Sequence, residues 1–202
     1  RALHSRIAEA IETLYSNRLI EQVERLAHHA ARGEIWAKAL TYLCQAGNKA
    51  DARSAIREAA SYFEQALTAL AHMPDHRETR EQAIDLHFNL RDSLTALGER
   101  ERGFEHLRAA QALAMALGDE RRLARVNMYI ARELSVQGEY EQAVASYERA
   151  IGMARTLDDY GLEVVATTYQ GFAYNCLGNY PKAVEAVGRN LAPLDSPVVR
   201  ER

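Results

Sequence analysis

The chain has 202 residues, and its 25 Lys and Arg residues against 28 Asp and Glu residues give a formal net charge of −3 at pH 7. A charge so close to zero provides no broad cationic surface, which argues against general binding to nucleic acid or to an anionic membrane. Apolar residues make up 48% and charged residues 26%, as is typical of a folded globular protein. No stretch of the sequence is apolar and long enough to be a membrane span.

Cysteine and proline usage narrows the class of protein further. Cys44 and Cys176 lie far apart in helical patterns, which favours a reducing compartment over a disulfide framework. The chain starts at Arg1 without a signal-like apolar segment, so we expect a cytoplasmic fragment cut from a longer protein. No proline lies between Pro74 and Pro181, and helix interiors tolerate proline poorly. The sequence therefore predicts an all-α protein.

Apolar residues recur every three or four positions through successive segments, which is the pattern of amphipathic helices that bury one face. Glycines stand where several of these segments should end, because glycine adopts the left-handed conformation of a helix C-terminus without a steric penalty. Ten helices are predicted, at residues 3–14, 19–31, 35–50, 54–72, 77–97, 99–117, 119–137, 139–157, 160–177 and 179–191.

Three of the glycines, Gly98, Gly138 and Gly178, are forty residues apart (138 − 98 = 40; 178 − 138 = 40). Each is followed five positions later by a small residue and nine positions later by a larger apolar one, which are Gly103 with Leu107, Ala143 with Tyr147 and Ala183 with Val187. The small residues let antiparallel helices approach closely, and the large ones fill the space beside them. One hairpin cannot bury its apolar face alone, so we expect about five hairpins to stack into a solenoid with repeats of roughly 40 residues.

The predicted hairpins span approximately residues 1–32, 33–73, 77–117, 119–157 and 159–191. They form a single solenoid domain at 1–192, and residues 193–202 are a tail or the start of a further repeat. If further repeats follow, a solenoid that is cut within the array exposes the apolar side of its last hairpin. We therefore also expect self-association through an exposed solenoid end.

The stretch 138–151 resembles the second helix of a tetratricopeptide (TPR) repeat, with two small residues, Ala143 and Ala150, around the aromatic Tyr147. A second copy runs from 59 to 67, preceded by Leu43, Ala46 and Gly47, which resemble the signature of the first helix of a repeat. The resemblance implies a right-handed α-α superhelix. This sequence departs from the family in its forty-residue period and in Ser54, which stands where the family has a glycine between helices.

A narrower resemblance covers residues 1–73, through the stretches 3–10, 24–30, 38–43 and 46–47. Their order is similar to the helical arm that follows the ATPase module of bacterial STAND-type regulators, notably those fused to an adenylate/guanylate cyclase. The resemblance implies a sensor or regulatory arm of a multidomain signalling protein. Similar regulators with another output domain, including transcriptional regulators whose arm binds a small-molecule inducer, remain an alternative.

The chain contains no glycine-rich phosphate loop, so we expect it neither to bind ATP in the usual way nor to be an enzyme by itself. We assign no catalytic residue, no cofactor and no metal site. Adjacent helical residues point about 100° apart, so His28 and His29 cannot easily share a metal, and the resemblance makes them part of a packing signature. Pro74 interrupts the helix between His72 and His76, and nothing near Cys176 suggests an activated thiol.

The first helix of each hairpin should line the inner wall of a TPR-like solenoid, so its groove-facing positions are the candidate binding site. Transfer of the TPR pattern gives Gln45, Asn48, Asn89, Asp92, Arg125, Met128, Tyr129, Arg132, Thr168, Tyr169, Phe172 and Asn175. Aromatic and arginine anchors together with amides suit a peptide or protein partner, or the ATPase module of the parent protein. A small-molecule inducer bound within the superhelix is the second hypothesis, and an enzyme of its own the third.

Overall fold

The computed structural model describes residues 1–191, and the expected tail at 193–202 lies outside the described residues. This part of the chain is all-helical: it contains ten α-helices and one short 3-10 helix, and no strand. The residues divide into two compact units, Arg1–Leu113 and Ala114–Arg202. None of the helices within 1–191 is both long enough and apolar enough to cross a membrane.

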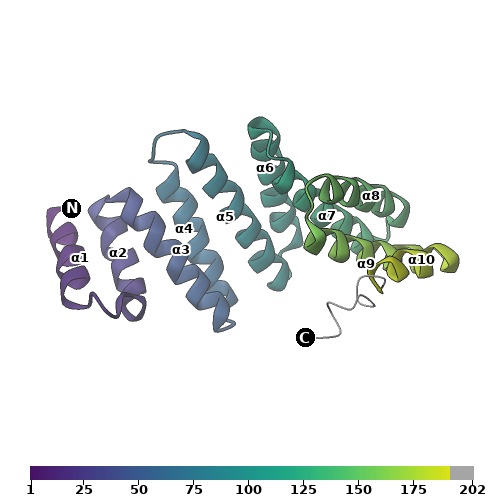
Figure 1. Cartoon of the computed structure of the whole chain (residues 1–202). Coiled ribbons are helices and arrows are strands. Elements are labelled where there is room, and N and C mark those ends of the chain that lie inside the picture. The colour runs from purple at the N-terminus through teal and green to yellow at the C-terminus, as the bar shows by residue number, and fades with distance from the viewer. Residues whose placement is uncertain (192–202) are drawn as a thin grey trace, which may run out of the picture. The chain divides into compact units, whose positions relative to one another are not determined.

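Unit 1 begins with a hairpin of α1 (Ala2–Leu14) and α2 (Val23–Gly33), with the 3-10 helix η1 (Leu19–Gln22) between them. The expected helix at 19–31 therefore starts with a separate 3-10 turn. The unit continues with α3 (Trp36–Ala52), α4 (Ile56–Leu70), α5 (Arg77–Ala96) and the first part of α6 (Arg100–Leu117). From α1 to α5 each helix packs on the one before it in the sequence, as Figure 1 shows.

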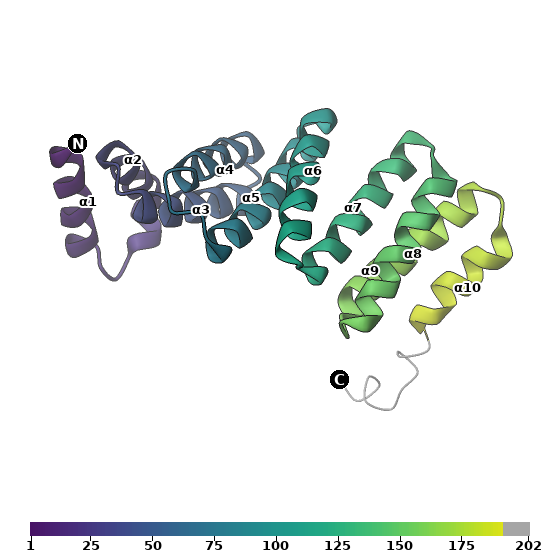
Figure 2. The same ribbon diagram turned by 90° about the horizontal axis from the view of Figure 1, so that it is seen from above.

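Unit 2 contains the end of α6 and two hairpins, which are formed by α7 (Glu120–Gln137) with α8 (Tyr140–Thr156) and by α9 (Tyr160–Cys176) with α10 (Tyr180–Leu191). Consecutive helices from α7 to α10 pack against each other, and α7 also contacts α9 directly (Figure 2). The first helices of successive hairpins are therefore neighbours, as in a TPR-like solenoid.

Most turns between helices contain one residue in the left-handed conformation. Glycine takes this role at Gly98, Gly118, Gly138 and Gly178, whose φ angles lie between 64° and 84°. Ser54 takes the same conformation with φ of 59°, although the TPR pattern expects glycine there. The sequence pattern also predicts a helix end at Gly33, and this is wrong by one residue: α2 includes Gly33, and Glu34 adopts the positive φ.

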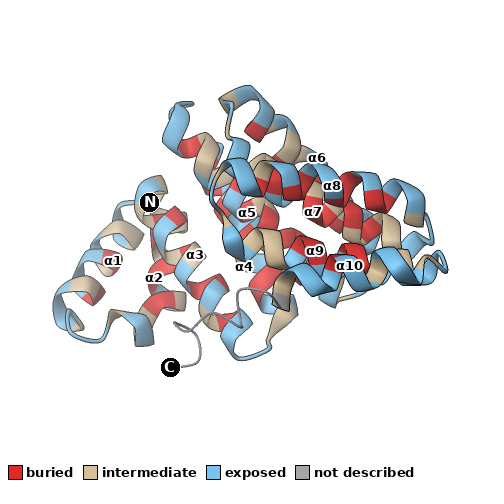
Figure 3. Ribbon diagram, turned by 45° about the vertical axis from the view of Figure 1, so that its right-hand side comes forward, coloured by how far each residue is buried: buried red, intermediate tan, exposed pale blue. Residues whose placement is uncertain are grey.

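The small-residue rule of the repeat is visible in both cores. In unit 1, Gly47 of α3 lies under the ring of Phe63 of α4, so closely that an added Cβ would stand 2.4 Å from a ring carbon. In unit 2, Ala143 and Tyr147 of α8 are both fully buried. Val187, which occupies the large position of the last hairpin, is 40% exposed because no described helix follows α10. Figure 3 shows the buried residues along the helix faces that meet a neighbour.

Candidate functional site

In unit 1, the exposed side chains of α3 and α5, each the first helix of its hairpin, form a surface that we call the α3–α5 wall. It surrounds a cavity of about 390 Å³ between α3 and α5. The base is apolar, with Leu40 and Leu86, and the other lining residues are Thr41, Cys44, Gln45, Gln82, Asp85 and Asn89. This arrangement places hydrogen-bonding groups around a small apolar floor, which suits a peptide backbone or a polar ligand.

Two of the four predicted residues of unit 1, Gln45 and Asn89, come together at this cavity. Asn48 and Asp92 are exposed on the same helices but do not line it, and Asp92 accepts a hydrogen bond from the Arg91 guanidinium at 2.7 Å. Sequence reasoning missed Thr41 and Gln82. Helical spacing could have identified both residues, since Thr41 is one helical turn before Gln45 and Gln82 is two turns before Asn89, on the same helix faces.

Cys44 lines the same cavity, but its chemistry argues against a nucleophile. Burial raises the pKa of the Cys44 thiol to about 11 and outweighs a backbone hydrogen bond that lowers it. The thiol is therefore protonated at neutral pH, whereas a nucleophilic cysteine must be available as the thiolate.

The α7–α9 wall is the corresponding surface of unit 2, and it is aromatic and basic. The Arg132 guanidinium lies 4.8 Å from the ring centroid of Tyr169, which in turn stacks on the buried Tyr147 at 6.4 Å. Phe172 follows one turn later on α9 and is 57% exposed. Tyr169 is therefore held between a cation and a buried ring, while Phe172 offers most of its surface to a partner.

An apolar residue that was not predicted, Val165, extends this surface. It is exposed and stands four and seven positions before Tyr169 and Phe172, so the three form one stripe along α9. The spacing of four and three residues between Val165, Tyr169 and Phe172 could have identified Val165 from the sequence. Among the predicted residues of this helix, Asn175 is exposed, and Thr168 accepts a hydrogen bond from Asn190 of α10 at 3.0 Å.

Two predicted residues of α7 contribute little surface. Met128 is 6% and Tyr129 is 7% exposed, so these side chains fill space within the fold. Arg125 is exposed and donates to the Tyr129 hydroxyl at 3.1 Å. The structure thus brings Arg132, Tyr169 and Phe172 together as an accessible cluster and places Met128 and Tyr129 beneath the surface.

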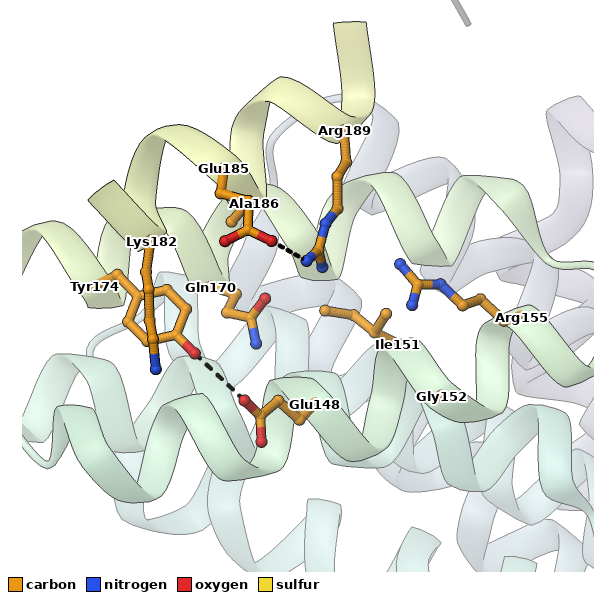
Figure 4. A pocket seen from close by; sticks show the side chains of 10 residues that line it. All are labelled: Glu148, Ile151, Gly152, Arg155, Gln170, Tyr174, Lys182, Glu185, Ala186 and Arg189. Carbon is orange, nitrogen blue, oxygen red and sulfur yellow. Dashed lines mark hydrogen bonds and ion pairs between the residues drawn. The ribbon is translucent and has the colours of Figure 1, made fainter. Parts of the chain in front are cut away.

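Unit 2 has a cavity of about 330 Å³ among α8, α9 and α10, which the sequence analysis did not predict (Figure 4). Its charged side chains have partners in neighbouring residues. The Arg189 guanidinium donates to Glu185 at 2.6 Å, and the Tyr174 hydroxyl donates to Glu148 at 3.3 Å. Lys182 lies 5.4 Å from the Tyr174 ring centroid. The contact of Lys182 with Tyr174 joins α10 to α9, and the bond from Tyr174 to Glu148 joins α9 to α8, so we assign this cavity a structural role.

No known family model matches the sequence, and no curated protein sequence is detectably similar to it. Solved structures are similar in fold. BtubC from P. vanneervenii matches over 93% of this chain and 87% of its own, with 20% identity and a TM-score of 0.63. The TPR-like repeats of a putative kinesin light chain from Podosopora anserina match over 97% of both chains, with 16% identity and a TM-score of 0.67.

A third structure, YrrB, is described as a TPR protein with an unusual peptide-binding site. It matches 97% of this chain and 87% of its own, with 19% identity and a TM-score of 0.56. Identities this low establish the fold and nothing more specific. The expected fold class is confirmed: the chain is an all-α protein with the consecutive helical hairpins of a TPR-like solenoid.

Proposed function

We propose that this chain is a non-catalytic protein-interaction and regulatory scaffold, and that its α7–α9 wall binds an extended segment of a partner protein. The observation that carries the proposal is the exposed stripe of Val165, Tyr169 and Phe172 beside the Arg132 guanidinium. Aromatic and arginine side chains are the groups that most often dominate binding energy at protein interfaces.

The chemistry of this wall suggests what the bound segment contains. Val165 and Phe172 suit an apolar anchor residue, because burying them on binding removes apolar surface from water. Arg132 suits a carboxylate, since a guanidinium can donate two parallel hydrogen bonds to it. We therefore expect an apolar side chain next to an acidic one in the partner. The peptide-binding site ascribed to YrrB, which shares the fold, supports a peptide as the kind of ligand.

The finer part of the proposal is that this scaffold is the regulatory arm of a STAND-type ATPase linked to an adenylate/guanylate cyclase in the bacterial cytoplasm. It rests on the resemblance of residues 1–73. In such a protein the partner is a separate protein or the ATPase module of the same chain. A ligand that binds one arrangement of the modules more tightly than another would shift the balance between them.

A small-molecule sensor is the alternative, and the cavity of the α3–α5 wall supports it. Its volume of about 390 Å³ is within the range of ligand sites, and its lining combines an apolar floor with several amides. An inducer of this kind would contact Gln45 and Asn89 and leave Phe172 untouched.

The experiment that tests the proposal is a screen of short peptides that pair apolar with acidic residues, followed by fluorescence anisotropy with the full chain. We expect Phe172→Ala and Arg132→Glu each to weaken binding by about tenfold or more. Leu14→Ala is the control, because Leu14 is an exposed apolar residue on α1 of unit 1 and belongs to neither the wall nor the α10 surface. Binding that Leu14→Ala weakens as much as Phe172→Ala would contradict the assignment of the wall.

Self-association through an exposed end is also part of the proposal. Tyr180, Val184 and Val187 are exposed at intervals of four and three residues, so α10 carries an apolar stripe that no described helix covers. We expect dimers or larger species at micromolar concentration in sedimentation velocity, and a shift toward monomer in Val184→Lys. A wild-type chain that sediments only as monomer contradicts this expectation.

A further inference from the structure

The N-terminal hairpin brings three histidines together from two helices. His4 lies on α1, and His28 and His29 lie on α2. The Nδ1 atoms of His4 and His29 are 2.9 Å apart, and the ring centroid of His28 is 5.9 Å from that of His4 and 5.1 Å from that of His29. Nitrogen atoms of all three rings lie within 4.8 Å of one another. Two segments separated by more than twenty residues thus converge on one point.

The packing of α1 on α2 explains why the rings meet. Gly33 at the end of α2 lies against Ser5, and a Cβ at Gly33 would stand 2.8 Å from the Ser5 hydroxyl oxygen. Because Gly33 has no side chain, the start of α1 can approach the end of α2. His29 lies one helical turn before Gly33, so this approach brings it close to His4. Although His28 and His29 are adjacent on α2, their ring centroids are only 5.1 Å apart, and the ring of His4 on the neighbouring helix lies close to both.

The protonation of the cluster suits metal binding. A hydrogen bond between two Nδ1 atoms needs a proton on one ring and a free lone pair on the other, so at least one ring of the His4–His29 pair is neutral. Neutral imidazole is the form that binds a metal.

We propose that His4, His28 and His29 form a binding site for a zinc ion, with three imidazole ligands and a fourth position for water or an external ligand. Three histidines and one open position are an established coordination for zinc. At a zinc–nitrogen distance of about 2.0–2.1 Å, tetrahedral ligands are about 3.3 Å apart. The ring nitrogens, of which His4 and His29 bring two to 2.9 Å and all three lie within 4.8 Å, are therefore close to the separation that a zinc ion needs.

A second histidine pair in the same unit shows what distinguishes the site. His87 and His106 also approach to 2.9 Å between Nδ1 atoms, but only two rings meet there. Within residues 1–191, the His4, His28 and His29 cluster is the one group of three or more histidine, cysteine or acidic side chains with converging ligand atoms. The consequence of zinc binding is a bond between α1 and α2, so the ion would stabilise the N-terminal hairpin.

The test is a calorimetric titration of zinc into the full chain after removal of metal with a chelator. We expect one zinc ion to bind per chain. Loss of a residue that only supports a metal ligand typically weakens metal binding 10- to 100-fold, so we expect a larger loss when a ligand itself is removed in His28→Gln or His4→Gln. His28 is exposed, so His28→Gln should leave the fold intact. His72→Gln is the matched control, because it removes an exposed histidine outside the cluster.

A second measurement identifies the ligands directly. Cobalt in place of zinc should give the intense visible absorption of a tetrahedral site in the wild type and in His72→Gln, and lose it in His28→Gln. Zinc should also raise the melting temperature of the first two proteins and not of the third, because a ligand that binds only the folded state stabilises it. Equal zinc affinity in His28→Gln and wild type, or no binding above that of an isolated histidine, would overturn the proposal.

Discussion

The first helices of the two units share their architecture but not their surface. The α3–α5 wall presents amides such as that of Gln45, a hydroxyl and one carboxylate, Asp85, around a cavity. The α7–α9 wall instead presents Tyr169, Phe172 and Arg132. The buried positions are alike, with small residues against large apolar ones in both units. A repeat therefore constrains the residues that pack hairpins together, while the exposed positions of each first helix are free to take different chemistry.

The histidines divide between the units in the same uneven way. All seven lie in residues 1–113, and the sequence from 114 onward has none. The single tryptophan, Trp36, also lies in unit 1, where it stacks on His72 with ring centroids 4.0 Å apart. Tryptophan fluorescence thus reports on unit 1, whereas circular dichroism reports on the helices of both. The two signals together can separate changes in the two units.

The largest effect is expected from Ala143→Asp in unit 2. Ala143 is fully buried, and an aspartate there would place a carboxyl group without a partner between helices. We expect a loss of about 4 kcal/mol or more in the free energy of unfolding. In urea unfolding, the transition seen by circular dichroism should shift much more than the one seen by Trp36 fluorescence. Unchanged unfolding would show that the repeat register is wrong.

A somewhat smaller effect is expected from Gly47→Leu in unit 1, with Gly171→Leu in unit 2 as its counterpart. At Gly47 an added Cβ meets the buried ring of Phe63 at 2.4 Å, so we expect a loss of about 3 kcal/mol, seen by Trp36 fluorescence. At Gly171 the nearest atom is a methyl carbon of Val187 at 2.7 Å. Val187 is partly exposed and can move, so the loss there should be less than half as large. Equal losses would contradict this difference between the units.

Acidification should act on unit 1 through the half-buried pair of His87 and His106. Burial lowers the pKa of His87 to about 4, with a further contribution from His106, while burial and Arg102 lower the pKa of His106. Below the ordinary pKa of about 6.5, the unfolded chain takes up protons that the folded chain refuses. The stabilisation is therefore complete above pH 6.5 and is lost as the pH falls toward 4.

The expected slope is up to about 1.4 kcal/mol per pH unit for each such proton. Urea unfolding between pH 7 and pH 4.5, followed by Trp36 fluorescence, measures it. His87→Gln should flatten the dependence, and the contribution of unit 2 to circular dichroism should change little over the same range. A slope that His87→Gln leaves unaltered would assign the acid sensitivity to other groups.

The smallest effect is expected for the α3–α5 wall. Gln45→Ala and Asn89→Ala remove polar side chains from the rim of a cavity whose apolar floor stays in place. We expect each to change the free energy of unfolding by no more than about 0.5 kcal/mol and to leave peptide binding to the α7–α9 wall unaltered. Anisotropy with the same peptide as for Phe172→Ala measures the second effect. A tenfold loss of binding in Gln45→Ala would assign the peptide to both walls.

Much of the fold could be read from the sequence because its signals are local. The period of three to four residues predicts ten helical segments, each within a few residues of the observed bounds, and the glycines at forty-residue spacing predict the turns. The spacing of Ala143 and Tyr147 predicts that both side chains of α8 face the core, and the structure buries both. An amphipathic helix has one apolar face, so the spacing of its apolar residues by itself indicates which side chains pack against the neighbouring helices.

The surfaces needed the tertiary structure. The TPR pattern placed Met128 and Tyr129 in the groove, and they are buried, while Val165 and Thr41 were missed and are exposed. A register based on sequence assigns a helix face to within about one residue, or 100°, which is too coarse to separate a residue on the wall from its neighbour beneath it. Which side chains of the first helices are accessible depends on how closely the adjacent helices approach.

The sequence by itself determined that this chain is a series of helical hairpins, because helix formation and hairpin packing follow from spacings of three, four and forty residues. Only the tertiary structure decided that His4 meets His28 and His29, and that Arg132 meets Tyr169. The residues of each meeting are separated by more than twenty positions and lie on different helices. Their proximity is set by the distance and rotation between helices, which no local pattern of residues encodes.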